Sequence, residues 1–311
     1  MIRLEGVTKK YGSVTALREV SFQIEQGETV GLLGRNGAGK TTLMNLMTGY
    51  FPPTEGRVVI GGKDMLGDSA ACKRMIGYLP ERPPLYDEMT TEEYLRFVCE
   101  LREVQKGAIA GHVKEIMALC GLTEMRRRLL GHLSKGYRQR AGIAQALCGS
   151  PEILIFDEPT VGLDPKQTVE IRELIRKLRG DHTVVFSSHI LSEVQQACSR
   201  VIILDEGRMV KDYRGEEPEG ETIRVRLTIG GRAESLIPRL KRLEFISGAE
   251  ILPEAGEGET EARILMPRGG NRGEALDRAF RGLAEAGIPV RMMKEEKETL
   301  EEVFLKSTSD I

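Results

Sequence analysis

The chain of 311 residues is 40% hydrophobic and 30% charged, and its formal net charge is −2. This composition excludes an intrinsically disordered protein. Because positive charge is not in excess, the sequence also argues against a nucleic-acid-binding surface, and we expect no nucleic-acid partner. The length accommodates two domains of ordinary size.

Neither a membrane-spanning helix nor a secretion signal is visible in the sequence. No apolar run approaches the ~20 residues that cross a bilayer, and the N-terminus leads directly into a strand-like pattern. The five cysteines are dispersed without a CxxC pair, which is typical of reduced thiols. We therefore expect the protein to stay in the cytoplasm.

The first part of the chain predicts strands around one helix, followed by a helix-rich region. Alternating or continuous apolar residues predict strands at 2–7, 20–24, 29–33 and 57–60. A helix is predicted at 41–48. Apolar residues at helical spacing then indicate several helices within 91–130.

From Gly136 onward the pattern alternates between helix and strand. The predicted elements are helix 138–147, strand 153–156, helix 166–178, strand 183–187, helix 191–197 and strand 201–204. The strands are almost entirely apolar, which is typical of a parallel sheet covered on both faces. This part of the chain is therefore predicted to have an α/β fold.

An acidic segment rich in turn formers, 214–220, marks a predicted boundary between a first domain at 1–215 and a second at 220–311. The second domain is predicted as strand 222–229, helix 233–243, strands 247–252 and 261–266, helix 272–286, strand 289–293 and a final helix 300–306. The β-α-β-β-α-β order of the first six is that of a ferredoxin-like α+β domain.

Gly34–Thr41 fits the phosphate-loop pattern GxxxxGK[ST] between an apolar strand and a helix. Glycines let the backbone N–H groups point inward at phosphates, and the helix N-terminus adds a positive dipole. Lys40 is expected to reach the β- and γ-phosphates, and the Thr41 hydroxyl to ligate Mg²⁺. The remaining residues of the cradle are Asn36, Gly37, Ala38, Gly39 and Thr42.

Asp157 and Glu158 follow an apolar strand, at the end where parallel strands meet their ligands. We expect Asp157 to hold Mg²⁺ through water and Glu158 to polarise the attacking water in phosphoryl transfer. A third segment, 133–140, places Ser134 as the cap of a helix whose positive end attracts phosphate.

In this order the three segments resemble the ATP-binding subunits of ABC transporters, over roughly residues 1–215. Segment 133–140 is similar to the family's LSGGQ-type signature, with Lys135 in place of the first glycine and Tyr137-Arg138 before Gln139. The resemblance implies ATPase activity with ATP and Mg²⁺. It also implies a cassette with a parallel sheet core, an antiparallel β subdomain and a helical subdomain at about 85–145.

The resemblance further implies a dimer with two ATP molecules between the subunits. In the family the signature contacts the nucleotide of the opposite subunit, so Ser134, Gly136 and Gln139 are expected to bind there. Residues 162–165 resemble the loop that passes information between the two sites, with Asp164 at the nucleotide interface. We expect an ATP-dependent homodimer, although a heterodimer also fits the sequence.

Two single residues take roles from the same resemblance. His189, after Ser187-Ser188, resembles the switch histidine that contacts the γ-phosphate, and it joins Lys40 and Glu158 as a catalytic residue. Tyr11 resembles the aromatic residue that stacks on adenine.

One position departs from the family. The loop between the two lobes normally carries a glutamine that touches Mg²⁺ and senses the γ-phosphate, whereas this chain has Glu81. We expect Glu81 to bind the metal or sense the γ-phosphate. The Tyr-Leu-Pro-Glu form and the following 83–86 segment resemble a branch of ABC-2-type exporter subunits that includes gliding-motility and copper-maturation ATPases.

These features favour the motor subunit of an exporter, which acts on a separate transmembrane permease subunit from the inner face of the membrane. Tyr94, Leu95 and Phe97 are candidates for the groove that receives that subunit, or for ordinary helix core. Two alternative functions fit the sequence less well. A soluble ABC ATPase acting on the ribosome or DNA is disfavoured because the chain has one cassette and no long coiled coil, and a non-hydrolysing regulator is disfavoured by the intact ATP motifs.

Overall fold

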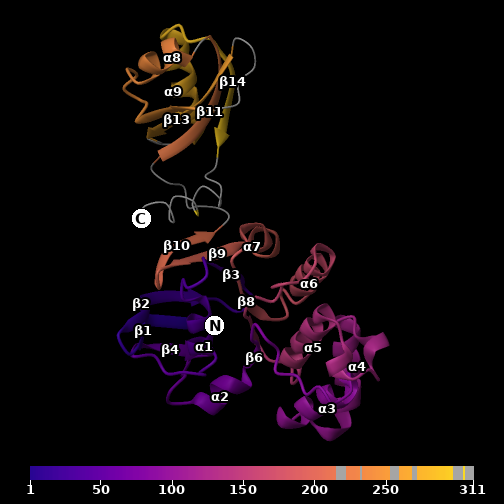
Figure 1. Ribbon diagram of the computed structural model, residues 1–311. Coiled ribbons are helices and arrows are strands. Elements are labelled where there is room, and N and C mark those ends of the chain that lie inside the picture. Colours follow the sequence, from indigo (N-terminus) through magenta and orange to yellow (C-terminus); the bar gives the residue numbers. More distant parts are fainter. Residues whose placement is uncertain (215–221, 232, 253–258, 268–271, 297–303, 305–311) are drawn as a thin grey trace. The chain divides into compact units, whose positions relative to one another are not determined.

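We describe the fold from a computed structural model, which covers residues 1–214, 222–231, 233–252, 259–267, 272–296 and 304. The chain divides into a larger compact unit containing Met1–Gly215 and a smaller one within Glu216–Val303. Each unit has its own hydrophobic core, and their elements are labelled in Figure 1. None of the helices in the described ranges combines the length and the apolar character that crossing a lipid bilayer requires.

A six-stranded sheet in the order β10-β9-β3-β8-β7-β6 forms the centre of the larger unit. Its strands are β3 (Thr29–Leu33), β6 (Ile76–Leu79), β7 (Ile153–Phe156), β8 (Thr183–Ser188), β9 (Arg200–Asp205) and β10 (Arg208–Arg214). All neighbours are parallel except β10, which runs antiparallel to β9. Every residue of β3, β7 and β8 is buried, as the apolar runs predict for a parallel sheet covered on both faces.

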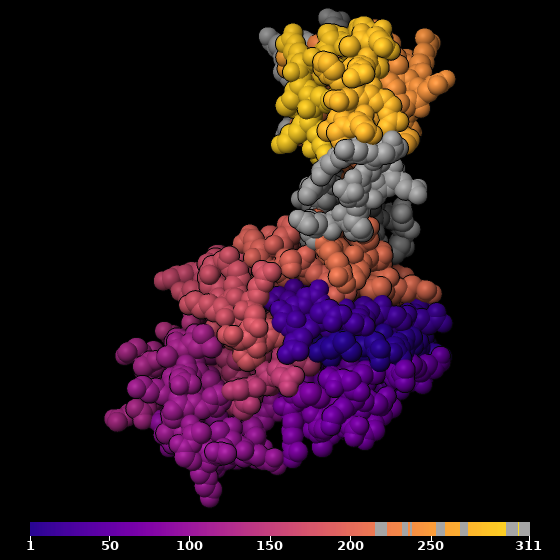
Figure 2. All heavy atoms as spheres, turned by 180° about the vertical axis from the view of Figure 1, so that it is seen from behind, coloured from indigo at the N-terminus to yellow at the C-terminus, as the bar shows by residue number. Residues whose placement is uncertain are grey.

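A second, antiparallel sheet has the order β2-β1-β4-β5. Its strands are β1 (Ile2–Tyr11), β2 (Val14–Ile24), β4 (Glu55–Ile60) and β5 (Lys63–Asp64). The first two are longer than predicted, because hairpin pairing continues to Tyr11 opposite Val14. Ile2 and Leu4 share a core with Leu32 and Ile155 of the parallel sheet. The face in Figure 2 shows these first strands in indigo and the helical subdomain in magenta, on opposite sides of the larger unit.

The helices of the larger unit differ in what they pack against. The helical subdomain contains α3 (Thr91–Leu101), α4 (Lys106–Leu119) and α5 (Lys135–Leu147), whereas the short helix α2 (Ser69–Arg74) contacts β5 and β6. Three accompany the parallel sheet: α1 (Lys40–Met47), α6 (Pro165–Lys177) and α7 (Leu191–Ala197). Two short 3₁₀ turns, Thr123–Met125 and Leu130–His132, lead into α5. The predicted cassette fold, with its helical subdomain, is confirmed (Figure 1).

The smaller unit contains β11 (Thr222–Gly230), α8 (Ala233–Leu240), β12 (Gly248–Ile251), β13 (Glu259–Pro267), α9 (Arg272–Glu285) and β14 (Val290–Glu296). Its sheet is antiparallel throughout, in the order β12-β13-β11-β14. With the β-α-β-β-α-β chain order, this is a ferredoxin-like arrangement. Alternate residues of β11, including Val225 and Leu227, pack with Leu283 of α9 in the core. The final helix predicted at 300–306 lies outside the described residues apart from Phe304.

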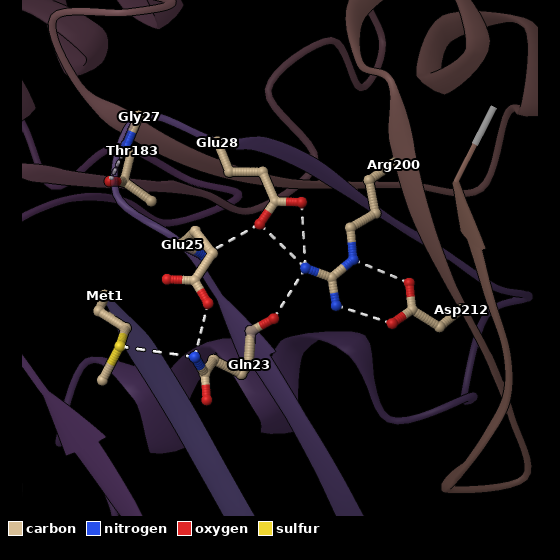
Figure 3. Close-up of polar contacts among 8 residues, drawn as sticks. All are labelled: Met1, Gln23, Glu25, Gly27, Glu28, Thr183, Arg200 and Asp212. Atoms are coloured by element: carbon tan, nitrogen blue, oxygen red, sulfur yellow. Dashed lines mark hydrogen bonds and ion pairs between the residues drawn. The ribbon is translucent and has the colours of Figure 1, made fainter. Parts of the chain in front are cut away.

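The strand β10 was not predicted, because Arg208–Arg214 is largely polar and exposed or half-buried. A buried ion-pair network fastens it to the sheet (Figure 3). The guanidinium of Arg200, only 3% exposed, donates two hydrogen bonds of 2.8 and 2.7 Å to the carboxylate of Asp212 on β10. It also donates to Glu28 at 2.9 Å and to the backbone oxygen of Gln23 at 2.7 Å. We call these four residues the Arg200 clamp.

Candidate active site

The loop between β3 and α1 forms a tight cradle. Gly37 and Gly39 have positive φ angles of 87° and 101°, which glycine adopts without strain. A side chain at Gly39 would also bring a Cβ to 2.8 Å from the backbone oxygen of Ala16. Lys40, at the start of α1, is buried, and its ammonium donates to the backbone oxygens of Gly34 at 2.7 Å and Arg35 at 3.2 Å. The backbone of the loop is therefore tightly packed, and the ammonium of Lys40 is held by backbone oxygens.

A pocket of about 360 Å³ opens at this loop. It brings together nine predicted site residues: Asn36, Gly37, Gly39, Lys40, Thr41, Thr42, Glu81, Glu158 and His189. Ala16, Arg35 and Val161 complete its lining. The predicted cradle residue Ala38 is instead buried beneath the loop, where its backbone N–H donates to the oxygen of Arg35.

Asp157 follows β7 and is almost completely buried. Its Oδ1 accepts a 2.6 Å hydrogen bond from the Ser187 hydroxyl, whereas its buried Oδ2 has no hydrogen-bond partner. Burial raises the pKa of Asp157, although the hydrogen bond from Ser187 and the neighbouring Thr41 hydroxyl act in the opposite direction. A buried carboxylate oxygen without a donor is costly unless a cation satisfies it. The residues around Asp157 thus fit a hard divalent cation such as Mg²⁺.

Glu158 lies between two other predicted catalytic residues. One oxygen, Oε1, is 3.3 Å from the ammonium of Lys40, and the other, Oε2, is 2.8 Å from Nδ1 of His189. Its backbone has a φ of 46°, in the left-handed region, and its N–H donates to the Ser187 hydroxyl at 2.8 Å. This geometry directs the carboxylate into the pocket beside the lysine and the histidine.

Ser187 is a site residue to which the sequence analysis assigned no role. Its hydroxyl donates to Asp157 and accepts from the backbone N–H of Glu158, so one fully buried side chain orients both acids. The signal was present in the sequence as the Ser187-Ser188 pair before His189, but only the pairing of β7 with β8 shows which acids the hydroxyl meets.

Besides Ala38, five predicted nucleotide-binding residues do not line the pocket: Tyr11, Ser134, Gly136, Gln139 and Asp164. Ser134 caps α5 by accepting from the Tyr137 N–H at 3.5 Å, and Asp164 caps α6 by accepting from the Gln167 N–H at 2.8 Å.

The starts of the two capped helices lie close together. A Cβ built on Gly136 would lie 2.6 Å from Gln167, and one built on Gly162 would lie 2.1 Å from the ammonium of Lys135. Gln139 is buried with an unpaired amide nitrogen. The first residues of α5 and the turn that leads into α6 therefore lie side by side, and none of Ser134, Gly136, Gln139 and Asp164 lines the phosphate-loop pocket.

Tyr11 ends β1 and is 41% exposed. Its ring contacts Phe51 edge-on, with centroids 6.1 Å apart, and the Lys9 ammonium lies 5.2 Å from its centroid. The ring is therefore available to a flat ligand on its open side, and Phe51 and Lys9 are neighbours that the sequence analysis did not identify.

A separate groove of about 970 Å³ runs between the helical subdomain and the sheet. Tyr94 and Phe97 of α3 line it, and so do Thr41, Glu81 and Asp157, which connect it to the phosphate-loop region. Leu95 is not among the residues that line the groove, and its side chain is completely buried.

Comparisons with known proteins agree with this geometry. A family model described as ABC transporter matches residues 17–161. The chain is 30% identical to a daunorubicin resistance ATP-binding protein of Streptomyces coeruleorubidus, over 99% of this chain and 96% of the relative. It is 33% identical to a linearmycin resistance ATP-binding protein of Bacillus subtilis, over 81% and 82%. A solved dimeric ATP-binding cassette with ADP and phosphate has a TM-score of 0.64 and 28% identity, over 70% of this chain and all of that one.

A phosphate loop after β3, an acid pair after β7 and a helical subdomain before β7 define a P-loop ATPase of the cassette type. With nearly full coverage of a relative at 30% identity, the chain belongs to the ATP-binding subunits of ABC transporters. Membership implies ATP binding, ATP hydrolysis and a role in transport.

Proposed function

We propose that this chain is the ATP-hydrolysing motor of an ABC-2-type exporter, acting on a separate transmembrane permease subunit from the cytoplasmic face of the membrane. Hydrolysis is supported mainly by the position of Glu158, whose carboxylate contacts both Lys40 and His189 and follows Asp157 with its unpaired oxygen. The ABC-2 branch is supported by relatives named for resistance to daunorubicin and linearmycin. The narrower likeness to gliding-motility and copper-maturation ATPases stays a prediction.

In this proposal the cradle binds the phosphates through its backbone N–H groups and Lys40. Lys40 would exchange its contacts with Gly34 and Arg35 for phosphate oxygens. Thr41 and Asp157, with Glu81 at the pocket edge, would hold Mg²⁺. When bound, Mg²⁺ offsets the negative charge of the β- and γ-phosphates. Tyr11 would offer its open face to adenine.

Glu158 would orient and polarise the water that attacks the γ-phosphate. Its 2.8 Å contact with His189 keeps the carboxylate directed into the pocket, and the histidine would contact the γ-phosphate from the same side. Both residues come from the ends of neighbouring parallel strands, β7 and β8, where ligands bind in α/β sheets.

We further propose that two copies form an ATP-dependent dimer. Ser134 and Asp164 cap the adjacent starts of α5 and α6, and like Gly136 and Gln139 they lie outside the phosphate-loop pocket, which supports their action on the nucleotide of the second copy. A similar solved cassette is dimeric with ADP and phosphate. A ligand that binds only between the subunits makes association depend on ATP.

The groove lined by Tyr94 and Phe97 is the proposed docking site for the permease. It is rich in aromatic side chains, including Tyr50 and Tyr86, which are 70% and 52% exposed. Exposed aromatic residues in a concave surface are characteristic of protein interfaces. Glu81 lines both this groove and the pocket, so it links permease docking to the nucleotide.

A mild-detergent pull-down from native cells tests this function. The bait is the Glu158→Gln variant with ATP, which should hold the closed dimer, and the control is the same bait without nucleotide. We expect a polytopic membrane protein in stoichiometric amount. Recovery of ribosomes or DNA-repair proteins without a membrane partner would refute the proposal and favour the ABC ATPase that acts on the ribosome or DNA.

Glu81→Ala should lower kcat by about 10-fold and raise the Mg²⁺ concentration needed for half-maximal ATPase activity, because it removes a carboxylate near the metal. Glu81→Gln, the residue usual in the family, should retain most of the rate. The measurement is ATPase activity across a Mg²⁺ titration. If Glu81→Ala changes neither rate nor Mg²⁺ dependence, the sensor role is wrong.

A further inference from the structure

Glu193, on α7, is a buried acid that the proposed chemistry does not use. It is 5% exposed, and among the described residues no lysine, arginine or histidine forms an ion pair with it. One of its oxygens, Oε2, accepts hydrogen bonds from two hydroxyls, that of Thr160 at 2.8 Å and that of Ser188 at 2.7 Å. Burying a carboxylate without a cationic partner costs free energy. Its presence here therefore suggests a role for the two hydrogen bonds that it accepts.

The two hydroxyls belong to the two segments that carry the catalytic residues. Thr160 comes two residues after Glu158, and Ser188 immediately precedes His189. Glu193 therefore joins the segment after β7 to the end of β8, directly behind the 2.8 Å contact between Glu158 and His189. The Ser188 hydroxyl also accepts a 3.0 Å hydrogen bond from the N–H of Ile190. Ser188 precedes His189 and Ile190 follows it, so this bond holds the backbone on both sides of the histidine.

The backbone at Glu158 needs such support. Its φ of 46° is unfavourable for a residue with a side chain, and such conformations persist only when the surroundings hold them. The Ser187 hydroxyl holds the N–H of Glu158 from one side. The turn that follows, in which the Val161 N–H donates to the Glu158 oxygen at 3.1 Å, is held from the other side through Thr160.

We infer that Glu193 is a positioning residue for ATP hydrolysis: its carboxylate ties Thr160 to Ser188 and so sets the separation between Glu158 and His189. The inference rests on the proposed function, because it concerns the geometry of the proposed catalytic pair. Glu193 itself is not among the residues that line the phosphate-loop pocket. Its loss should therefore affect the rate of hydrolysis and leave ATP binding unchanged.

Glu193→Ala should lower kcat roughly 10- to 100-fold, since small displacements of catalytic groups have effects of this size. KM should change less than about twofold, because the lost geometry matters in the transition state. Glu193→Gln should stay within about threefold of wild type, because an amide oxygen still accepts from both hydroxyls. The matched control is Gln195→Ala, at an exposed position on the same helix.

A second measurement does not depend on activity. The protein has four histidines, so the ring ¹H–¹³C signals can be assigned individually. In nucleotide-free protein, Glu193→Ala should shift the His189 signal, whereas Glu193→Gln and Gln195→Ala should leave it in place. If Glu193→Ala fails to fold, Thr160→Val and Ser188→Ala each remove one hydroxyl and should each lower kcat and shift His189.

The outcomes separate the two proposals. If wild type does not hydrolyse ATP, the proposed function fails, and the His189 signal still decides whether Glu193 positions that residue. If wild type hydrolyses ATP and folded Glu193→Ala keeps the wild-type kcat and His189 signal, the inference about Glu193 is wrong. Equal losses in Glu193→Ala and Gln195→Ala would also overturn it, because they would indicate a general effect on α7.

Discussion

Replacing Glu158 with glutamine is expected to lower kcat for ATP hydrolysis by roughly 10²–10⁴-fold while ATP binding is retained. The carboxylate is the only one in the pocket that contacts both Lys40 and His189, at 3.3 and 2.8 Å, among the residues that the structure describes. The amide preserves the shape but cannot accept a proton from the attacking water. It also removes a negative charge beside the phosphates, so the ATP-bound form should persist.

The test compares kcat from steady-state ATPase assays with the affinity for ATP, both measured on the same protein preparations. Glu152→Gln is the matched control, because it makes the same acid-to-amide change at an exposed position just before β7. A Glu158→Gln variant that hydrolyses ATP at the wild-type rate would exclude Glu158 as the catalytic base. A variant that loses hydrolysis only because it no longer binds ATP would assign Glu158 to binding instead.

Replacing Arg200 with methionine is expected to lower the free energy of unfolding of the larger unit by about 3–5 kcal/mol, the usual cost of removing one partner of a buried ion pair. The guanidinium is 3% exposed and neutralises Glu28 and Asp212 together. Burial alone would lower the pKa of Arg200, but hydrogen bonds to Asp212 and Glu28 raise it above the ordinary value. Methionine leaves both carboxylates without their cation.

Urea unfolding, followed by circular dichroism, measures this loss. Arg208→Met is the control, because Arg208 is an exposed arginine on β10, the strand that pairs with the β9 strand of Arg200. Adding Glu28→Gln and Asp212→Asn to Arg200→Met should recover part of the stability, since the uncompensated charges are then gone. Equal destabilisation by Arg208→Met, or no recovery in the triple variant, would show that charge pairing in the Arg200 clamp is not the cause.

The sequence predicted most closely those elements whose pattern is local and strongly apolar. Strand Ile153–Phe156 and helix Leu191–Ala197 begin and end where predicted. The phosphate loop was also predictable, because its glycines and the side chains of Lys40 and Thr41 stand at fixed spacing within one short segment. The ferredoxin-like arrangement of the smaller unit was predicted from the order of four strands and two helices, and the observed strand pairing confirms it.

The features that the sequence did not predict depend instead on contacts between distant parts of the chain. The strand β10 has no apolar pattern of its own and is ordered by pairing with β9 and by Arg200. Leu95 could not be separated from Phe97 by sequence, because helical spacing identifies a buried face without telling which neighbours cover it. The roles of Ser134, Gln139 and Tyr11 stay predictions, since they concern a ligand and a second subunit rather than contacts within the chain.

What the sequence determined by itself is therefore the class of protein: a phosphate loop, an acid pair after an apolar strand and a histidine, in the order of an ABC cassette. Tertiary structure alone decided how these groups are held. Arg200 meets Glu28 across 172 residues of chain, and Thr160 meets Glu193 across 33. Such contacts depend on the order of strands in the sheet, which no local pattern encodes, because the same polar residues at other positions would simply be solvated.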